Sequence, residues 1–273
     1  MGILDQEAAA GFLRMCDDGW LQGWHERNGG NLTCRLLPGE VERCRPWLHT
    51  PLRRAELGVE APELAGEYFL TTGSGKYFRN VRRAPLENIG IVRIDGSGSA
   101  YEIVWGLEGD ARPTSEFASH ILNHRVRREV TRGRDRVIYH AHTPALIAMT
   151  YILPLTDRDF TRILWKSATE CPVVFPAGVG VVDWMVPGGP EIARATSGKM
   201  ARYDAVVWAH HGLFCAGPDY DSAFGLMHTI EKAADVFMRV QGSGLALRQT
   251  ITDDGLREIA QAFGVCLNMD FLD

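Results

Sequence analysis

The stretch "RVIYHAHTPALIAM", residues 136–149, decides how the centre of the chain folds. Its first half is an apolar run that predicts a β-strand, and Pro144 then begins a pattern typical of a helix. Alternate side chains of a strand share a face, so Ile138, His140 and His142 point the same way. The sequence therefore predicts two imidazoles that converge where a strand ends.

Length, composition and charge limit the classes of protein to consider. The chain has 273 residues, 45% of them hydrophobic and 23% charged, which is ordinary globular composition. The formal net charge is -5, and no run of Lys and Arg is interleaved with aromatic residues, so we expect no nucleic-acid partner. The most basic stretch, residues 123–136, predicts a solvated helix face.

Other features concern the cellular setting. No apolar stretch reaches the roughly 18 residues that a membrane span needs, and the first residues carry acids where a signal peptide has bases. The six cysteines include no C-x-x-C pair, which predicts reduced thiols rather than a disulfide framework or a zinc ribbon. We therefore expect a cytoplasmic protein with no membrane association.

A hairpin signal settles the fold class. Residues 89–105, "IGIVRIDGSGSAYEIVW", read as two strands that turn at Gly96 to Ser99. Adjacent antiparallel strands argue against an all-parallel doubly wound sheet, and the later alternation of strand and helix argues against an all-β fold. We predict an α/β fold with a mixed sheet covered by helices, in one domain spanning residues 1–273, because no linker or repeat divides the chain.

The remaining element predictions follow the same periodicities. Residues 38–62 lack a sustained period and predict an irregular region with short elements at most. Helices are predicted over residues 6–24, 115–130, 144–152 and 221–241. Strands are predicted over residues 31–37, 67–72 and 136–142, with a pair of short strands over 172–184.

A second strand end adds to the histidine signal. The stretch "AVVWAHHGLF", residues 205–214, reads as a strand that runs into His210 and His211. Three histidines at the ends of two strands are able to bind Zn²⁺ and leave its fourth position open for substrate. At this level His210 and His211 are both candidates, and two hydrogen-bonded histidines remain the alternative to a metal site.

A rival metal site lies on a predicted helix. Glu116, His120 and His124 are spaced by four residues and would line one helix face. The basic residues that follow would repel a divalent cation, so we favour a polar helix face there. Glu116 fits a carboxylate favoured by a helix N-terminus, although no capping box accounts for it. Glu170, in "SATEC", is a second candidate carboxylate that by itself reads as solvent-facing.

Two glycine-rich turns are candidates for binding a phosphate. They are "ERNGGNLT", residues 26–33, and "TTGSGKYF", residues 71–78. Glycine lets successive backbone N–H groups turn toward an anion. Ordinary tight turns are the alternative. The second turn is not a Walker A loop, because Tyr77 follows Lys76 where Ser or Thr is required. Side-chain donors in these turns are Asn28, Asn31, Thr72 and Ser74.

Taken in order, six motifs resemble the class II sugar-phosphate aldolases over nearly the whole chain. They are "GWHERNGGNLT", "TGSGKYFRNV", "PTSE", "HAH", "SATEC" and "HHGLF". The first two favour the rhamnulose-phosphate branch over the fuculose-phosphate aldolases and the ribulose-phosphate epimerases. The resemblance implies a three-layer fold with a largely antiparallel sheet, one Zn²⁺ per subunit and a homotetramer.

The resemblance also implies a role for particular residues. Glu116 matches the acid–base residue of the family, and Glu170 matches a second carboxylate near the aldehyde half of the substrate. The implied zinc ligands are His140, His142 and His211. The positions implied to hold the phosphate or the three-carbon donor are Asn28, Gly30, Asn31, Ser74, Gly75, Thr114 and Ser115.

The activity implied by this resemblance is reversible cleavage of L-rhamnulose 1-phosphate to dihydroxyacetone phosphate and L-lactaldehyde, a step of rhamnose metabolism. Two alternatives remain at this level. One is another metal-dependent sugar-phosphate enzyme of the family: a fuculose-phosphate aldolase, an epimerase or a dehydratase. The other is a non-catalytic, zinc-stabilised assembly module, which would keep the histidines but have no need of Glu116.

Overall fold

The computed structural model describes residues 2–51 and 53–273. Within them the strands form one nine-stranded sheet in the order β2-β5-β4-β3-β1-β6-β9-β8-β7. Neighbouring strands are antiparallel, except for the parallel pair of β7 and β8. The strands are β1 (Asn31–Arg35), β2 (Arg53–Glu56), β3 (Tyr68–Thr72), β4 (Ile89–Ile94), β5 (Ala100–Gly106), β6 (Val137–Ala141), β7 (Gly180–Val182), β8 (Ala205–Trp208) and β9 (Gly212–Gly217).

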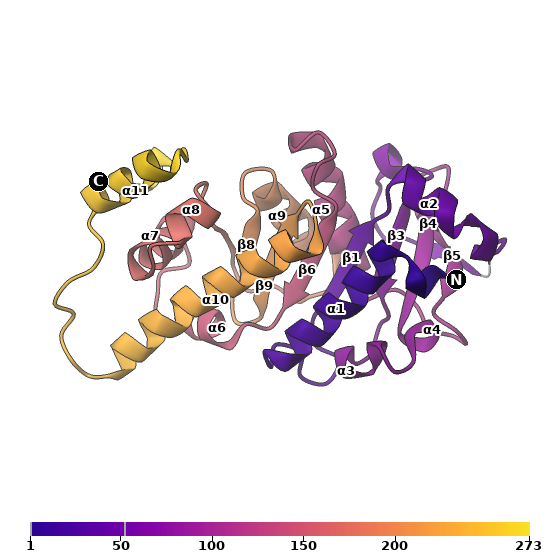
Figure 1. Ribbon diagram of the computed structural model, residues 1–273, viewed down its shortest axis with the longest axis horizontal. Coiled ribbons are helices and arrows are strands. Elements are labelled where there is room, and N and C mark those ends of the chain that lie inside the picture. Colours follow the sequence, from indigo (N-terminus) through magenta and orange to yellow (C-terminus); the bar gives the residue numbers. More distant parts are fainter. Residues whose placement is uncertain (1, 52) are drawn as a thin grey trace.

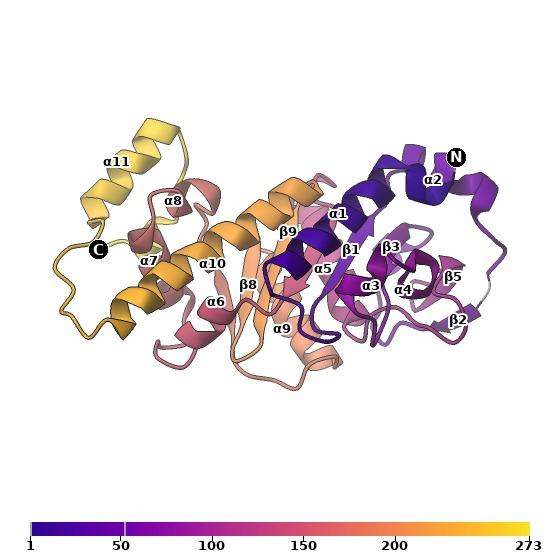
Figure 2. The ribbon, with the colours of Figure 1, turned by 60° about the horizontal axis from the view of Figure 1, so that its bottom comes forward.

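Helices cover both faces of the sheet. One face carries α1 and α10, which run obliquely across the strands, and α5 and α9 lie on the opposite face (Figures 1 and 2). The α-helices are α1 (Glu7–Leu21), α2 (Pro38–Cys44), α3 (Phe78–Val81), α4 (Pro85–Asn88), α5 (Phe117–Val130), α6 (Pro144–Met149), α7 (Asp157–Ser167), α8 (Cys171–Val174), α9 (Pro190–Met200), α10 (Tyr220–Gly242) and α11 (Asp253–Phe263). The predicted mixed, largely antiparallel sheet between two helical layers is confirmed.

Alternation along β6 divides the core in two. Val137 and Tyr139 pack in the cluster that includes the apolar residues of α1 and α10. Ile138 packs in a separate cluster with Ile192 and Met200 of α9. His140 shares the face of Ile138, as the strand period requires, and its ring stacks on Phe214 with centroids 4.3 Å apart.

Most predicted elements are present. The hairpin of residues 89–105 is β4 and β5, and the predicted helices correspond to α1, α5, α6 and α10. The irregular region 38–62, of which residue 52 lies outside the described part, holds only short elements. The strand pair predicted over 172–184 is wrong: its first half is the helical turn α8, because Pro172 is tolerated in the first turn of a helix. Its second half, β7, pairs in parallel with β8 instead of forming a hairpin.

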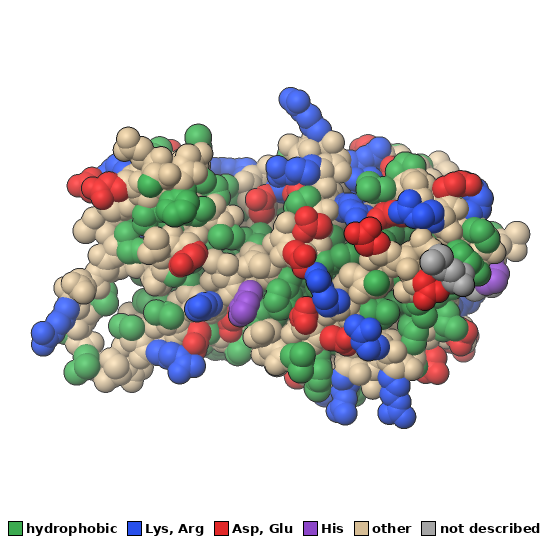
Figure 3. Space-filling view, in the orientation of Figure 1, with side chains coloured by type: hydrophobic (Ala, Val, Ile, Leu, Met, Phe, Trp, Pro, Cys, Tyr) green, Lys and Arg blue, Asp and Glu red, His purple; other side chains and the backbone are tan. Residues whose placement is uncertain are grey.

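The basic stretch 123–136 is only partly a solvated face. The Arg127 side chain is buried, and it donates to Asp135 Oδ2 at 2.6 and 3.0 Å and to the carbonyl of Met200 at 3.0 Å. Such a guanidinium is held in the interior by its paired charge and its satisfied donors. Elsewhere acidic and basic side chains are interspersed over the face shown in Figure 3.

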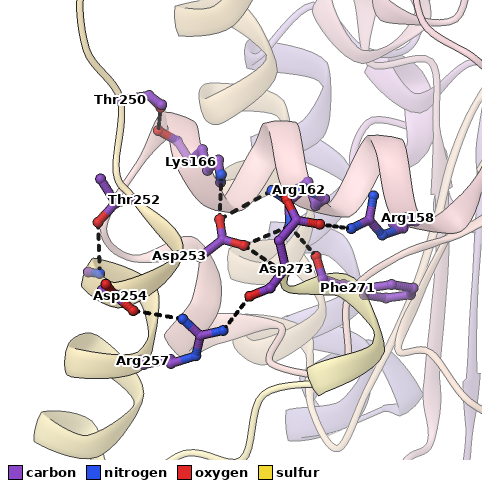
Figure 4. Close-up of polar contacts among 11 residues, drawn as sticks. Arg158, Arg162, Lys166, Thr250, Thr252, Asp253, Asp254, Arg257, Phe271 and Asp273 are labelled. Carbon is purple, nitrogen blue, oxygen red and sulfur yellow. Dashed lines mark hydrogen bonds and ion pairs between the residues drawn. The ribbon is translucent and has the colours of Figure 1, made fainter.

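The C-terminal region returns to the body of the molecule after an extended segment that follows α10 (Figure 1). Ion pairs fasten α11 and the last residues to α7 (Figure 4). Arg162 donates to Asp253 at 2.9 Å and to Asp273 at 2.8 Å, and Lys166 lies 2.5 Å from Asp253. Among the helices of the described residues, none is both long and apolar enough to cross a membrane.

Candidate active site

Four strands bring the candidate residues to one edge of the sheet. Because β3, β1, β6 and β9 are antiparallel neighbours, the end of β3, the start of β1, the end of β6 and the start of β9 lie together. Asn31 at the start of β1 is in register with His140 near the end of β6. His211 directly precedes β9. The sheet order therefore assembles a site from segments far apart in the sequence.

Three histidines cluster at this edge. One ring nitrogen from each of His140, His142 and His211 lies within 4.8 Å of the other two. The His140 ring is buried, and its Nδ1–H donates to the carbonyl of Leu213 at 3.1 Å. That bond leaves the lone pair on Nε2, which is buried and has no hydrogen-bond partner among the described atoms. An unpaired imidazole lone pair facing two other imidazoles fits a metal ligand.

The other two histidines also suit a cation. His142 Nδ1 donates to Glu26 Oε1 at 2.5 Å, the outer carboxylate that commonly orients a metal-binding imidazole. The pKa of His211 is lowered to about 4, mainly by burial and to a smaller extent by the neighbouring His142. Burial, followed by His211 and His142, lowers the pKa of His140. Neutral imidazoles are the form that binds Zn²⁺, so the residues present fit that ion.

Glu116 lies beside this cluster. Its Oε2 is 3.6 Å from His140 Nε2, and its Oε1 is 3.9 Å from His211 Nε2. The residue occupies the N-cap position of α5, but its side chain makes no capping bond; instead Oε2 accepts a hydrogen bond from Asn31 Nδ2 at 2.9 Å. Burial raises the pKa of Glu116, and the Asn31 amide opposes that shift. A buried carboxylate with a raised pKa is the kind of group that can transfer a proton.

The first glycine-rich turn closes against the histidines. A Cβ on Gly29 would lie 2.8 Å from the His142 ring, and one on Gly30, whose φ is +73°, would lie 2.7 Å from the His140 carbonyl oxygen. The buried His25 fixes this turn: its Nδ1–H donates to the carbonyl of Gly29 at 3.0 Å, and its Nε2 accepts from the Tyr139 hydroxyl at 2.6 Å. Glycine is required here because a side chain would collide with the histidine cluster.

The second glycine-rich turn lies against the segment that leads to Glu116. Gly73 forms a β-bridge with Pro113, and the Ser74 N–H donates to the carbonyl of Arg112 at 2.8 Å. The Thr114 N–H donates to the carbonyl of Thr72 at 2.9 Å, so these bonds pair the second turn with residues 112–114 in an antiparallel register. Thr114 is buried, and its hydroxyl accepts from the Glu116 N–H at 3.3 Å. Of the residues expected to bind the phosphate or the three-carbon donor, those with exposed positions are Asn28, Ser74, Gly75 and Ser115.

Other candidates lie elsewhere. His210 has a positive φ of 59°, and its Nδ1 lies 3.0 Å from the Thr150 hydroxyl, so His211 is the one that joins the cluster. His120 and His124 are buried and hydrogen-bonded to Thr33, so the expected polar helix face is turned to the interior. The group of described residues that could hold a metal ion includes neither of them. Glu170 is exposed at the start of α8, and among the described residues no hydrogen bond or ion pair joins it to the histidines.

Sequence reasoning missed two residues of the site. Glu26 and His25 both lie within the motif "GWHERNGGNLT", but nothing in their spacing indicates that one contacts His142 and the other Tyr139. The two contacts join the first motif to Tyr139 of β6 and to His142 just after it, more than one hundred residues later. The two segments become neighbours through the pairing of β1 with β6, which local sequence spacing does not reveal.

Three histidines that face one another, with a buried carboxylate beside them at one edge of a mixed sheet, fit the active site of a metal-dependent enzyme. Comparison with known proteins agrees. Residues 10–238 match the family model described as the class II aldolase and adducin N-terminal domain. The chain belongs to this family, and it is a class II aldolase.

Individual relatives are similar over nearly their full length. A rhamnulose-1-phosphate aldolase of Klebsiella pneumoniae is 46% identical over 263 residues, 96% of this chain and 95% of the relative. One of Escherichia coli O157:H7 is 46% identical over 255 residues, 93% of each. Among solved structures, a sugar-phosphate aldolase from Thermotoga maritima superposes with a TM-score of 0.72 at 26% identity, covering 86% of this chain and 95% of that one.

Proposed function

We propose that this chain is a zinc-dependent aldolase that reversibly cleaves L-rhamnulose 1-phosphate to dihydroxyacetone phosphate and L-lactaldehyde. The observation that carries the proposal is the position of the Glu116 carboxylate, 3.6 Å from one histidine of the cluster and 3.9 Å from another. A purely structural zinc site would not need a buried carboxylate there. The substrate follows the names of the relatives that are 46% identical.

The proposed metal ligands are His140, His142 and His211. A bound Zn²⁺ would stabilise the negative charge that develops next to the substrate carbonyl when the carbon–carbon bond breaks. His140 and His142 are held for this task by Leu213 and Glu26, which bind their Nδ1 atoms. Because each ring is oriented through its other nitrogen, the chain itself sets where the cation lies.

The proposed role of Glu116 is proton transfer at the donor carbon. In the cleavage direction the C4 hydroxyl passes its proton to water, the C4–O bond becomes the aldehyde carbonyl, and the electrons of the C3–C4 bond move onto the three-carbon fragment. Glu116 then delivers a proton to C3 of that fragment, and it removes the same proton in synthesis. Glu170 keeps the role of second carboxylate, toward the aldehyde half, as a proposal that rests on the resemblance alone.

The proposed phosphate site consists of the two glycine-rich turns and the segment before Glu116. Its members are Asn28, Gly30, Asn31, Ser74, Gly75, Thr114 and Ser115. Backbone N–H groups at glycines with positive φ, such as Gly30 and Gly75, are suited to surround an anion. Anchoring the phosphate there would hold the reacting carbons beside Glu116.

We also propose that residues 1–273 work as one domain in the cytoplasm and assemble as a homotetramer. The free cysteines, five of them buried, suit a reducing compartment. Large apolar side chains exposed on the isolated chain are the kind that an assembly would cover. They include Tyr151, Ile152, Trp184 and Val186.

Product analysis tests the proposed reaction. The zinc-loaded protein is incubated with L-rhamnulose 1-phosphate, L-fuculose 1-phosphate and L-ribulose 5-phosphate, and the products are separated and identified. We expect dihydroxyacetone phosphate and lactaldehyde from the first compound at the highest kcat/KM. Preferential cleavage of the second, epimerisation of the third, or loss of water in place of carbon–carbon cleavage would each contradict the proposal.

A further inference from the structure

A line of buried hydrogen bonds leads from the middle of α5 to the Glu116 carboxylate. His124 Nε2 lies 2.8 Å from the Thr33 hydroxyl, which lies 2.7 Å from His120 Nδ1. His120 Nε2 is hydrogen-bonded to Asn31 Oδ1, and Asn31 Nδ2 lies 2.9 Å from Glu116 Oε2. All five side chains are buried, so water does not compete for these bonds.

The direction of every hydrogen bond in the line follows from the group at its end, the Glu116 carboxylate. A carboxylate only accepts, so the Asn31 amide nitrogen faces Glu116 and its carbonyl oxygen faces His120. His120 must then donate from Nε2, which leaves Nδ1 as an acceptor for the Thr33 hydroxyl proton. The Thr33 oxygen in turn accepts from His124 Nε2–H. Every donor in the line therefore points toward Glu116.

We propose that Thr33 and His120 are positioning residues for catalysis, and that Asn31 is the link through which they hold the Glu116 carboxylate in its reactive orientation. With Oε2 fixed by Asn31, Oε1 is the oxygen left to exchange a proton with the substrate. Both polar atoms of the Asn31 side-chain amide have partners in this line, so this amide orients Glu116 from within the proposed phosphate site. The inference rests on the proposed function of Glu116.

Two threonines provide a matched pair of variants. Thr33 on β1 lies directly opposite Thr71 on β3, and both are fully buried. The Thr71 hydroxyl donates to the carbonyl of Thr72 at 3.1 Å and takes no part in the line. Valine has nearly the shape of threonine, so Thr33→Val removes the link whereas Thr71→Val removes an unrelated hydroxyl. Thr33→Ser retains the hydroxyl and serves as the rescue variant.

Proton exchange on dihydroxyacetone phosphate in D₂O, without aldehyde, is the activity to measure. We expect Thr33→Val to slow the exchange roughly tenfold, as is typical when support for a reactive group is removed, with zinc content and the Kd for dihydroxyacetone phosphate unchanged. Thr33→Ser should recover most of the rate, and Thr71→Val should retain it. Exchange at the parent rate in Thr33→Val, an equal loss in Thr71→Val, or a loss confined to the Kd would overturn the proposal.

A spectroscopic measurement separates this inference from the proposed reaction. The ¹⁵N shifts of the imidazole rings in the metal-free parent protein report which nitrogen carries the proton, whether or not the chain is an aldolase. His120 and His124 should both carry it on Nε2. A proton on Nδ1 of His120 would overturn the line of bonds even if Thr33→Val failed to fold. Correct tautomers in a protein that neither exchanges the proton nor cleaves the sugar phosphate would instead contradict the proposed function.

Discussion

Replacing Glu26 by glutamine tests the histidine cluster as a metal centre. In the structure Glu26 Oε1 accepts the Nδ1–H of His142 at 2.5 Å. A carboxylate in this position orients the ring and makes Nε2 a stronger donor to a cation, and removing such a partner typically weakens metal binding by ten- to a hundredfold. That loss corresponds to about 1.4 to 2.7 kcal/mol of binding free energy. Glutamine has nearly the same shape, so the fold should be retained.

The assay is competition for Zn²⁺ between the metal-free protein and a chromophoric chelator of known affinity. Glu42→Gln is the matched control, because the Glu42 side chain is 67% exposed, close to the 64% of Glu26, but pairs with Arg45 on the surface. We expect Glu26→Gln to lose zinc affinity and Glu42→Gln to retain it. Equal affinities in the two variants would refute the argument that Glu26 supports a metal ligand.

Three further outcomes are expected. Single alanine variants of the proposed ligands His140, His142 and His211 should each lose stoichiometric zinc in metal analysis. His210→Ala should keep its zinc. Ser74→Ala should weaken the binding of dihydroxyacetone phosphate roughly tenfold in calorimetry, because a hydrogen bond to a charged group contributes about 1.5 to 3 kcal/mol. An unchanged Kd would show that Ser74 does not bind the phosphate. Burial lowers the pKa of His25 and of His120 to about 3, below about 6.5 in the unfolded chain. Their stabilising effect is therefore present above pH 6.5 and is lost as the pH falls toward 3, so urea melts should show a loss of about 2 kcal/mol per histidine between pH 7 and pH 5. A metal-free protein equally stable at both pH values would contradict this.

The predictable part of the fold is the part governed by local patterns. The hairpin of β4 and β5 and the amphipathic helix α10 follow from periodicity within a few turns of chain, and both are present. The error at residues 172–184 arises because a four-residue apolar run has no period long enough to separate helix from strand. The helices α7, α9 and α11 were not predicted, although α11 has local signals at both ends: the Thr252 side chain caps its start and Gly264, with a positive φ, ends it.

Part of the candidate site also follows from local sequence patterns, and part depends on tertiary packing. His140 and His142 are indicated by their spacing on one strand, but local spacing did not choose between His210 and His211. The structure chooses because a positive φ at His210 turns that ring toward Thr150. His120 was expected on a polar helix face instead of in a metal site, because the basic residues that follow would repel a divalent cation. Its burial against β1 depends on the packing of α5 on the sheet, which no pattern within α5 reveals.

Register ties these observations together. One extra residue in β6 ahead of His140 would turn its ring to the opposite face, into the core cluster that holds Val137 and Tyr139. The same slip would displace Tyr139 from His25, and with it the support of the first glycine-rich turn. His140, the first glycine-rich turn and Asn31, which binds Glu116, therefore depend on the pairing of β1 with β6. An enzyme built this way tolerates change in its outer loops far better than a shift by one residue in a central strand.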